Sequence, residues 1–118
     1  MTTDSLRMLF SAWGQPEPDD RAATTDAAID TGFEYTDPSL PGIMAGREAY
    51  LAHLDQFGAA MPGASAEVVD ISETNGFARV TVDFFAGGKA MMRGQYFAEM
   101  SDGKVRRIVG FTGTGTPE

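Results

Sequence analysis

Apolar side chains recur at intervals of three and four residues in two parts of the chain, and this spacing predicts amphipathic helices. The first helix ends at the glycine- and proline-containing stretch 14–18, and its apolar stripe is Leu6, Leu9, Phe10 and Trp13. The other begins at Arg47, ends near residues 58–62, and carries Tyr50, Leu51, Leu54 and Phe57. A weaker, alanine-rich helix is expected over residues 19–30, before Gly32. The apolar stripes of these helices need a sheet to cover.

The second half of the chain supplies that sheet. Runs rich in strand-forming residues cover 66–73, 77–86, 90–100 and 104–112, and the pairs Asn75-Gly76, Gly87-Gly88 and Asp102-Gly103 mark two-residue hairpin turns between them. A short strand is also expected over residues 32–37. The predicted class is therefore α+β, with three N-terminal helices packed on a curved, mostly antiparallel sheet in a single domain of residues 1–118.

Counting residues from each turn predicts which side chains share a face of the sheet. The face toward the helices would carry Val69, Ile71, Val80, Val82, Phe84, Met91, Arg93, Gln95, Phe97 and Ile108. The outer face would carry Asp70, Thr81, Asp83, Met92, Tyr96, Met100, Val109 and Phe111. A bulge would reverse part of this assignment. The apolar side chains of the outer face would suit a homodimer that pairs sheet with sheet.

Asp37 is the candidate for acid–base chemistry. Alternation along a strand places Phe33, Tyr35 and Asp37 on one face, so a carboxylate lies beside two aromatic rings. Loss of hydration there is expected to raise the pKa of the carboxyl and let it exchange protons near neutral pH. The alternative is that Asp37 and Pro38 only end a strand or begin a turn. The following loop, residues 38–44, has an apolar tip and is a candidate lid over a cavity.

Composition and charge narrow the classes of function. Seventeen acidic and nine basic side chains give a net charge of −8, which disfavours binding to nucleic acid and to anionic membrane surfaces. Without cysteine and with one histidine, disulfides, thiolate nucleophiles and multi-histidine metal sites are excluded. Phosphate-binding loop motifs are lacking too, so we expect no cofactor and no metal. With neither an apolar signal run nor a spanning segment, the expected location is cytoplasmic.

Three short motifs, in this order of elements, resemble a known superfamily. They are Tyr35-x-Asp37-Pro38, Gly46-x-x-Ala49-Tyr50 and Asp102-Gly103-Lys104-Val105. The chain is similar to the nuclear-transport-factor-2-like superfamily, and within it to the SnoaL-like polyketide-cyclase and ketosteroid-isomerase branch. The resemblance implies a cone-shaped domain with a pocket between helices and sheet.

The same resemblance implies site residues. Asp37 matches the isomerase's general base. Gln95 lies near the isomerase's sheet aspartate and would donate a hydrogen bond to a developing oxyanion. The first helix lacks the isomerase's tyrosine, which disfavours steroid isomerisation itself. Arg93-x-Gln95 keeps only the arginine of the Arg-x-Asp pattern found in the limonene-epoxide-hydrolase branch, so epoxide hydrolysis is disfavoured as well.

Further side chains are candidates for the wall of a pocket that takes an apolar small molecule: Trp13, Tyr35, His53, Phe57, Phe84 and Phe97. For the aromatic rings the alternative is plain core packing. His53 would relay protons or be a satisfied, partly buried residue. Arg93 would hold a substrate oxygen or pair with a carboxylate of the sheet. Two functions stay open: a cofactor-independent isomerase or aldol-type cyclase acting on an apolar carbonyl compound, and a non-catalytic ligand-binding or dimerisation module.

Overall fold

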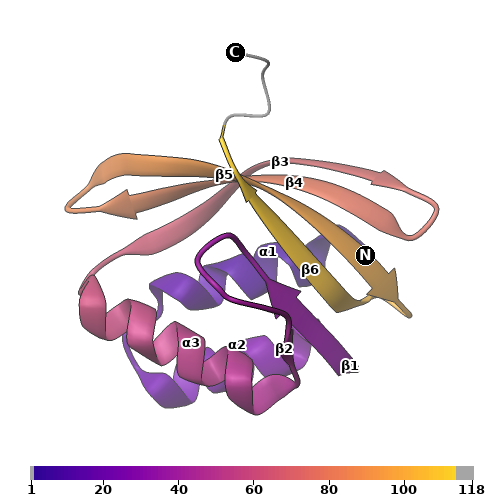
Figure 1. The fold of residues 1–118 in the computed structure, drawn as a ribbon, viewed down its shortest axis with the longest axis horizontal. Helices are drawn as coiled ribbons and strands as arrows, with labels where there is room; N and C mark the ends of the chain where they lie inside the picture. The colour runs from indigo at the N-terminus through magenta and orange to yellow at the C-terminus, as the bar shows by residue number, and fades with distance from the viewer. Residues whose placement is uncertain (1, 114–118) are drawn as a thin grey trace.

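The computed structural model describes residues 2–113, with side chains from residue 4 onward. Its helices are α1 (Thr2–Ser11), the 3₁₀ turn η1 (Ala12–Gly14), α2 (Pro18–Ala28) and α3 (Arg47–Ala60). Its strands are β1 (Ile29–Thr36), β2 (Met44–Ala45), β3 (Ser65–Thr74), β4 (Phe77–Ala86), β5 (Lys89–Ser101) and β6 (Lys104–Thr112). Figure 1 shows the three helices together on one side of the sheet, as the predicted α+β class requires.

The apolar stripes predicted for the first and third helices are confirmed as contacts with the core. Leu6, Leu9 and Phe10 on α1 are completely buried, and Trp13 in η1 is 5% exposed. On α3 the buried residues are Tyr50 and Leu54. α2 starts with a proline, whose missing N–H costs nothing in a first turn. None of these helices is long and apolar enough to cross a membrane, among the residues that the structure describes.

The strands form one six-stranded sheet in the order β2-β1-β6-β5-β4-β3. β3 to β6 form an antiparallel meander, as predicted, and β1 joins β6 in parallel. The three predicted two-residue turns are all present. Both central residues of each turn have positive φ, for example 49° at Asn75 and 84° at Gly76, which is the conformation that suits the right-handed twist of a hairpin.

Three bulges make the predicted register wrong in part. The pairing skips one residue in each of three strands: Val69 in β3, Met91 in β5 and Arg106 in β6. Because side chains alternate, each extra residue sends the rest of its strand to the other face. Val69, predicted to face the helices, is instead 44% exposed.

The largest correction concerns β5. Phe84 pairs with Met92 instead of Met91, so Tyr96 and Ala98 face the helices and are 5% and 3% exposed. Residues predicted for that inner face lie on the outer one: Arg93, Gln95 and Phe97. Met92 and Met100 move inward with Tyr96. The bulge in β6 reverses the faces again, so Ile108 is completely buried as predicted.

Candidate functional site

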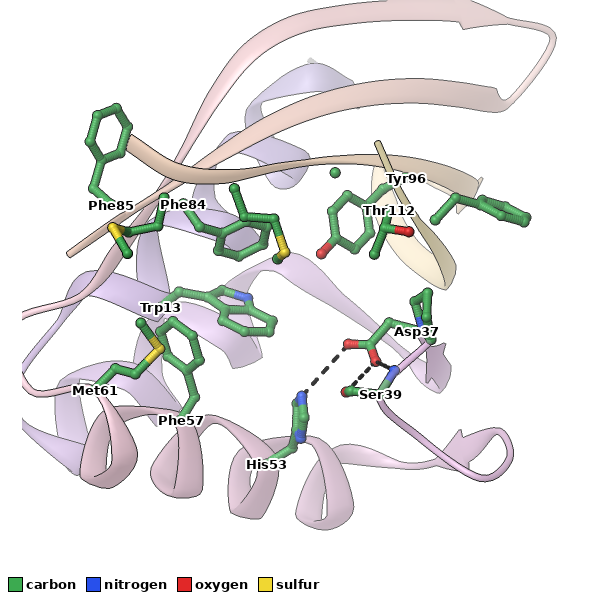
Figure 2. Close-up of a pocket in the computed structure, with 15 residues that line it drawn as sticks. Trp13, Asp37, Ser39, His53, Phe57, Met61, Phe84, Phe85, Tyr96 and Thr112 are labelled. Carbon is green, nitrogen blue, oxygen red and sulfur yellow. Dashed lines mark hydrogen bonds and ion pairs between the residues drawn. The ribbon is translucent and has the colours of Figure 1, made fainter. Parts of the chain in front are cut away.

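A cavity of about 400 Å³ lies between α3, η1 and the inner face of the sheet. Its apolar wall consists of Trp13, Pro38, Phe57, Met61, Phe84, Phe85, Met91, Met92 and Phe111, with the backbone of Gly94. The polar side chains that reach it are Asp37, Ser39, His53, Tyr96 and Thr112. Figure 2 shows Asp37 and Ser39 meeting His53 at one end of this space, with Trp13 and Phe57 toward the other. Volumes of this order accommodate small organic ligands.

Asp37 is held by hydrogen bonds on both oxygens. It follows the last residue of β1, and its side chain is 12% exposed. The Tyr35 hydroxyl donates to Oδ2 at 2.5 Å, which confirms that these two residues share a face. The Ser39 amide and hydroxyl both donate to Oδ1, at 2.8 and 2.5 Å. His53 Nε2 lies 3.8 Å from Oδ2. The carboxylate is therefore fixed at the edge of the cavity.

The predicted rise in the pKa of Asp37 is wrong. Burial is the largest single influence on this pKa and does raise it, but hydrogen bonds from Ser39 and Tyr35, together with His53, outweigh burial and lower the pKa below its ordinary 3.8. Donated hydrogen bonds stabilise the ionised form of a carboxyl. Asp37 is consequently a carboxylate throughout the neutral range.

His53 faces the cavity from α3, as one of its two predicted alternatives requires. Its side chain is 18% exposed, and its ring contacts those of Trp13 and Tyr35 at centroid distances of 5.8 and 5.7 Å. A role in proton transfer stays a prediction.

Tyr96 is a site residue that the sequence analysis placed on the wrong face of the sheet. Its ring packs against Phe10 at 4.9 Å, and Figure 2 shows its hydroxyl oxygen pointing into the cavity. Burial and the nearby charge of Asp37 raise the pKa of the phenol, although a hydrogen bond with Tyr35 acts in the opposite direction. The signal available in the sequence was Gly94, two residues before Tyr96 inside a strand, since a glycine there often marks a bulge or a close approach.

Three predicted site residues lie outside the cavity because of the register of β5. Arg93 makes two hydrogen bonds to Asp83, at 2.6 and 2.9 Å, which is the ion pair of its structural alternative. Gln95 accepts a hydrogen bond from Thr81 at 2.8 Å. Phe97 is 51% exposed and packs against Phe111. Gln95 and Phe97 line a shallower hollow on the outer face, so neither can touch a ligand in the cavity.

The other predicted wall residues are near the cavity. Trp13, Phe57 and Phe84 line it, while Tyr35 is buried behind it and reaches Asp37 through its hydroxyl. Trp13 is fixed by a hydrogen bond from Nε1 to the Tyr50 hydroxyl at 3.0 Å. In the loop after β1, Pro38 and Ser39 line the cavity, but Ile43 is 63% exposed. Closure of this loop over a ligand stays a prediction.

Comparisons with known proteins agree with the fold. A family model described as a SnoaL-like domain matches residues 6–108. No curated protein sequence matches the chain significantly.

Among solved structures, a candidate isomerase of the SnoaL-like family from Agrobacterium tumefaciens superposes with a TM-score of 0.83 at 16% identity, covering 95% of this chain and 97% of that one. A candidate ketosteroid isomerase from Kribbella flavida gives 0.72 at 21% identity, covering 99% and 81%. A candidate SnoaL-like polyketide cyclase from Jannaschia gives 0.76 at 16% identity, covering 94% and 84%. At these identities the likeness shows the fold alone.

Proposed function

This chain belongs to the SnoaL-like domain family, and from its cavity we propose that it is a cofactor-independent enzyme that removes a proton next to a carbonyl group in an apolar, ring-sized substrate. The observation that carries the proposal is the ionised, 12% exposed carboxylate of Asp37 at the edge of a largely apolar cavity of about 400 Å³. A carboxylate placed in this way can act as a general base on a carbon acid bound beside it.

The two oxygens of Asp37 have different surroundings. Both hydrogen bonds from Ser39 end on Oδ1, whereas Oδ2 accepts one from Tyr35 and lies on the side of His53. In Figure 2, Oδ2 is the oxygen nearer the body of the cavity. We therefore assign Oδ2 as the atom that takes the substrate's proton. Ser39 and Tyr35 hold the carboxylate in one orientation, which lowers the entropic cost of reaction.

The lowered pKa of Asp37 restricts the class of substrate. Lowering the pKa of the base widens the difference between it and the pKa of the carbon acid. Each unit of that difference adds about 1.4 kcal/mol to the free energy of proton transfer. Such a base is best suited to a carbon acid whose C–H group lies between a carbonyl and a second stabilising group, which is another carbonyl, an alkene or an aryl ring. The resulting enolate can be reprotonated at another carbon, which is an isomerisation, or can attack a second carbonyl, which is an aldol cyclisation. Structural neighbours described as a candidate isomerase and a candidate polyketide cyclase support this class of chemistry.

Proton exchange tests the proposal without knowledge of the natural substrate. The probe is 2-tetralone, a bicyclic ketone whose C1 protons lie between a carbonyl and an aryl ring, and NMR follows their replacement by deuterium in D₂O. We expect the wild-type protein to accelerate exchange, and Asp37→Asn to lower that rate at least about 100-fold. Asp83→Asn makes the same change on the outer face and should leave the rate unaltered. Exchange by D37N at the wild-type rate would remove Asp37 from the mechanism.

A non-catalytic binding module is the second candidate, and the same lowered pKa favours it because a weaker base is a poorer catalyst. In that case the cavity binds 2-tetralone without exchanging its protons. Titration of the fluorescence of Trp13, which lines the cavity, measures binding independently of turnover.

A further inference from the structure

We propose that Tyr96 is a catalytic residue that donates a hydrogen bond to the substrate's carbonyl oxygen, and that Gly94 and Gly110 position it. The inference rests on the proposed function, because Tyr96 would stabilise the negative charge that develops on the substrate when Asp37 removes a proton. When Asp37 takes a proton from carbon, the electron pair of that C–H bond forms the C=C bond of the enolate, and the π pair of the carbonyl moves to its oxygen. A donor aimed at this oxygen stabilises the enolate more than the ketone, and so lowers the barrier.

The side chain of Tyr96 has the required placement. It is 5% exposed, and its hydroxyl points into the cavity from the sheet, while Asp37 enters from the loop after β1 (Figure 2). A substrate in the cavity therefore has a base on one side and a phenol on another. The hydroxyl of Ser39 is already directed at Asp37 Oδ1, so it is a poorer donor to a ligand.

The ring of Tyr96 lies where two glycines leave room for it. A Cβ atom added at Gly110 would come within 2.6 Å of Tyr96 Cε1 and 3.1 Å of the Asp37 Cβ atom. One added at Gly94 would come within 3.1 Å of Tyr96 Cε2. Neither glycine has the positive φ that explains glycine in the hairpin turns. The close approach of Tyr96 explains both glycines instead, and Gly110 is also the cross-strand partner of Tyr96.

The protonation of Tyr96 suits a hydrogen-bond donor. Burial, with the charge of Asp37, raises the pKa of the phenol, so the hydroxyl stays neutral at physiological pH. Tyr35 donates its one hydroxyl hydrogen to Asp37, so it does not compete with Tyr96 as a donor to a ligand. An enolate oxygen carries more negative charge than a ketone oxygen, so it accepts a stronger hydrogen bond from the Tyr96 hydroxyl when the substrate reacts. The Tyr96 proton stays on Tyr96 throughout.

A pair of ligands separates this role from a structural one. The probe 2-naphthol has the skeleton of the enol of 2-tetralone and an oxygen at the same position, whereas naphthalene lacks the oxygen. We expect Tyr96→Phe to weaken 2-naphthol binding at least about 10-fold while changing naphthalene binding less than about 2-fold, and to slow exchange of 2-tetralone about 100-fold, mostly through kcat. Thr25→Val removes another buried hydroxyl, one on α2 that does not line the cavity, and should preserve the ratio of the two affinities.

Gly110→Ala provides a second variant, in which the hydroxyl is present but the ring is displaced. A folded G110A protein should also lose the preference for 2-naphthol over naphthalene. If Y96F keeps both that preference and the exchange rate, Tyr96 is not the donor. If a folded G110A keeps the preference, the glycines do not position it. Because the proposed function is tested by D37N, loss of exchange in D37N with an unchanged Y96F would overturn this inference alone.

Discussion

The two faces of the meander are made by alternate residues of the same strands, yet they differ in almost every physical respect. The inner face presents Val80, Val82 and Tyr96 to the helices, and all three are at most 5% exposed. The outer face carries ion pairs, such as Arg93 with Asp83 and Arg107 with Glu34. It also carries the half-exposed rings of Phe97 and Phe111, and Phe111 reaches the edge of the cavity as well. Neighbouring residues in sequence, Gln95 and Tyr96, therefore belong to different environments.

One extra residue in β5 changes which functional groups face the cavity. Without the bulge at Met91, counting from the Gly87-Gly88 turn puts Gln95 in the cavity and Tyr96 outside. With it, a phenol replaces an amide beside Asp37. The difference between the faces can be tested by matched changes on each.

The largest difference should come from removing a ring. Trp13 is 5% exposed and contacts several other rings, so Trp13→Ala should lower the free energy of unfolding by about 3–5 kcal/mol. Phe97 is 51% exposed, and Phe97→Ala should cost less than about 1 kcal/mol. Urea denaturation of both variants measures the two values. Equal losses would mean that the outer face is as tightly packed as the inner one.

The outer face itself should mediate self-association. Phe97 and Phe111 contact each other at 5.7 Å and leave half of their surface exposed, and we expect this pair to lie in a homodimer interface. The double variant Phe97→Lys/Phe111→Lys should weaken dimerisation at least about 100-fold, or about 2.7 kcal/mol.

Sedimentation equilibrium measures the dissociation constant of that dimer. Ile43→Lys changes an exposed apolar residue in the loop before β2 and should leave the constant unaltered. A wild-type protein that sediments as a monomer would contradict the prediction.

A smaller effect is expected in the dependence of stability on pH. The pKa of Asp37 is lowered in the folded state, so its stabilising contribution is fully present above the ordinary carboxyl pKa of 3.8 and is lost as the pH falls through the lower folded value. The difference in unfolding free energy between wild type and Asp37→Asn should therefore shrink below about pH 4.

The outer face provides the matched test of that pH dependence. Hydrogen bonds from Arg93 lower the pKa of Asp83 too, so Asp83→Asn should show the same sign. The effect of Asp83 should be weakened by 1 M salt, since Arg93 is 43% exposed, whereas that of Asp37 should persist. Equal salt sensitivity at the two sites would contradict the expected difference in solvent screening.

The smallest effect should follow deletion of Met91. Phe84 already pairs with Met92 and Phe85 with Ala90, so deleting Met91 leaves a regular ladder with Tyr96 still inside. We expect a change of less than about 1 kcal/mol in unfolding free energy and an unchanged near-UV circular dichroism spectrum.

Deletion of Phe97 is the control for the Met91 deletion. It removes a paired residue of β5, puts the two parts of the strand out of phase, and should abolish cooperative folding. Tolerance of both deletions would mean that register is not specified by the buried face.

Most of the elements could be predicted because their causes are local. The spacing of Leu6, Leu9 and Phe10 predicts a helix with one apolar face. Asn75-Gly76 favours its hairpin turn without help from distant residues. The placement of Asp37 beside Tyr35 follows from alternation along a single strand, and the structure confirms it.

The helices, the turns, the α+β class and the carboxylate beside the aromatic rings could thus be predicted from local sequence, since each depends on residues a few positions apart. The bulges, and with them whether Gln95 or Tyr96 reaches the cavity, follow from contacts between strands, because a bulge depends on how two strands pair and twist across the sheet. The direction of the pKa shift at Asp37 likewise depends on residues that folding brings together. Burial alone would raise that pKa, but hydrogen bonds donated by Ser39 and Tyr35, together with the electrostatic effect of His53 on α3, outweigh burial and lower it.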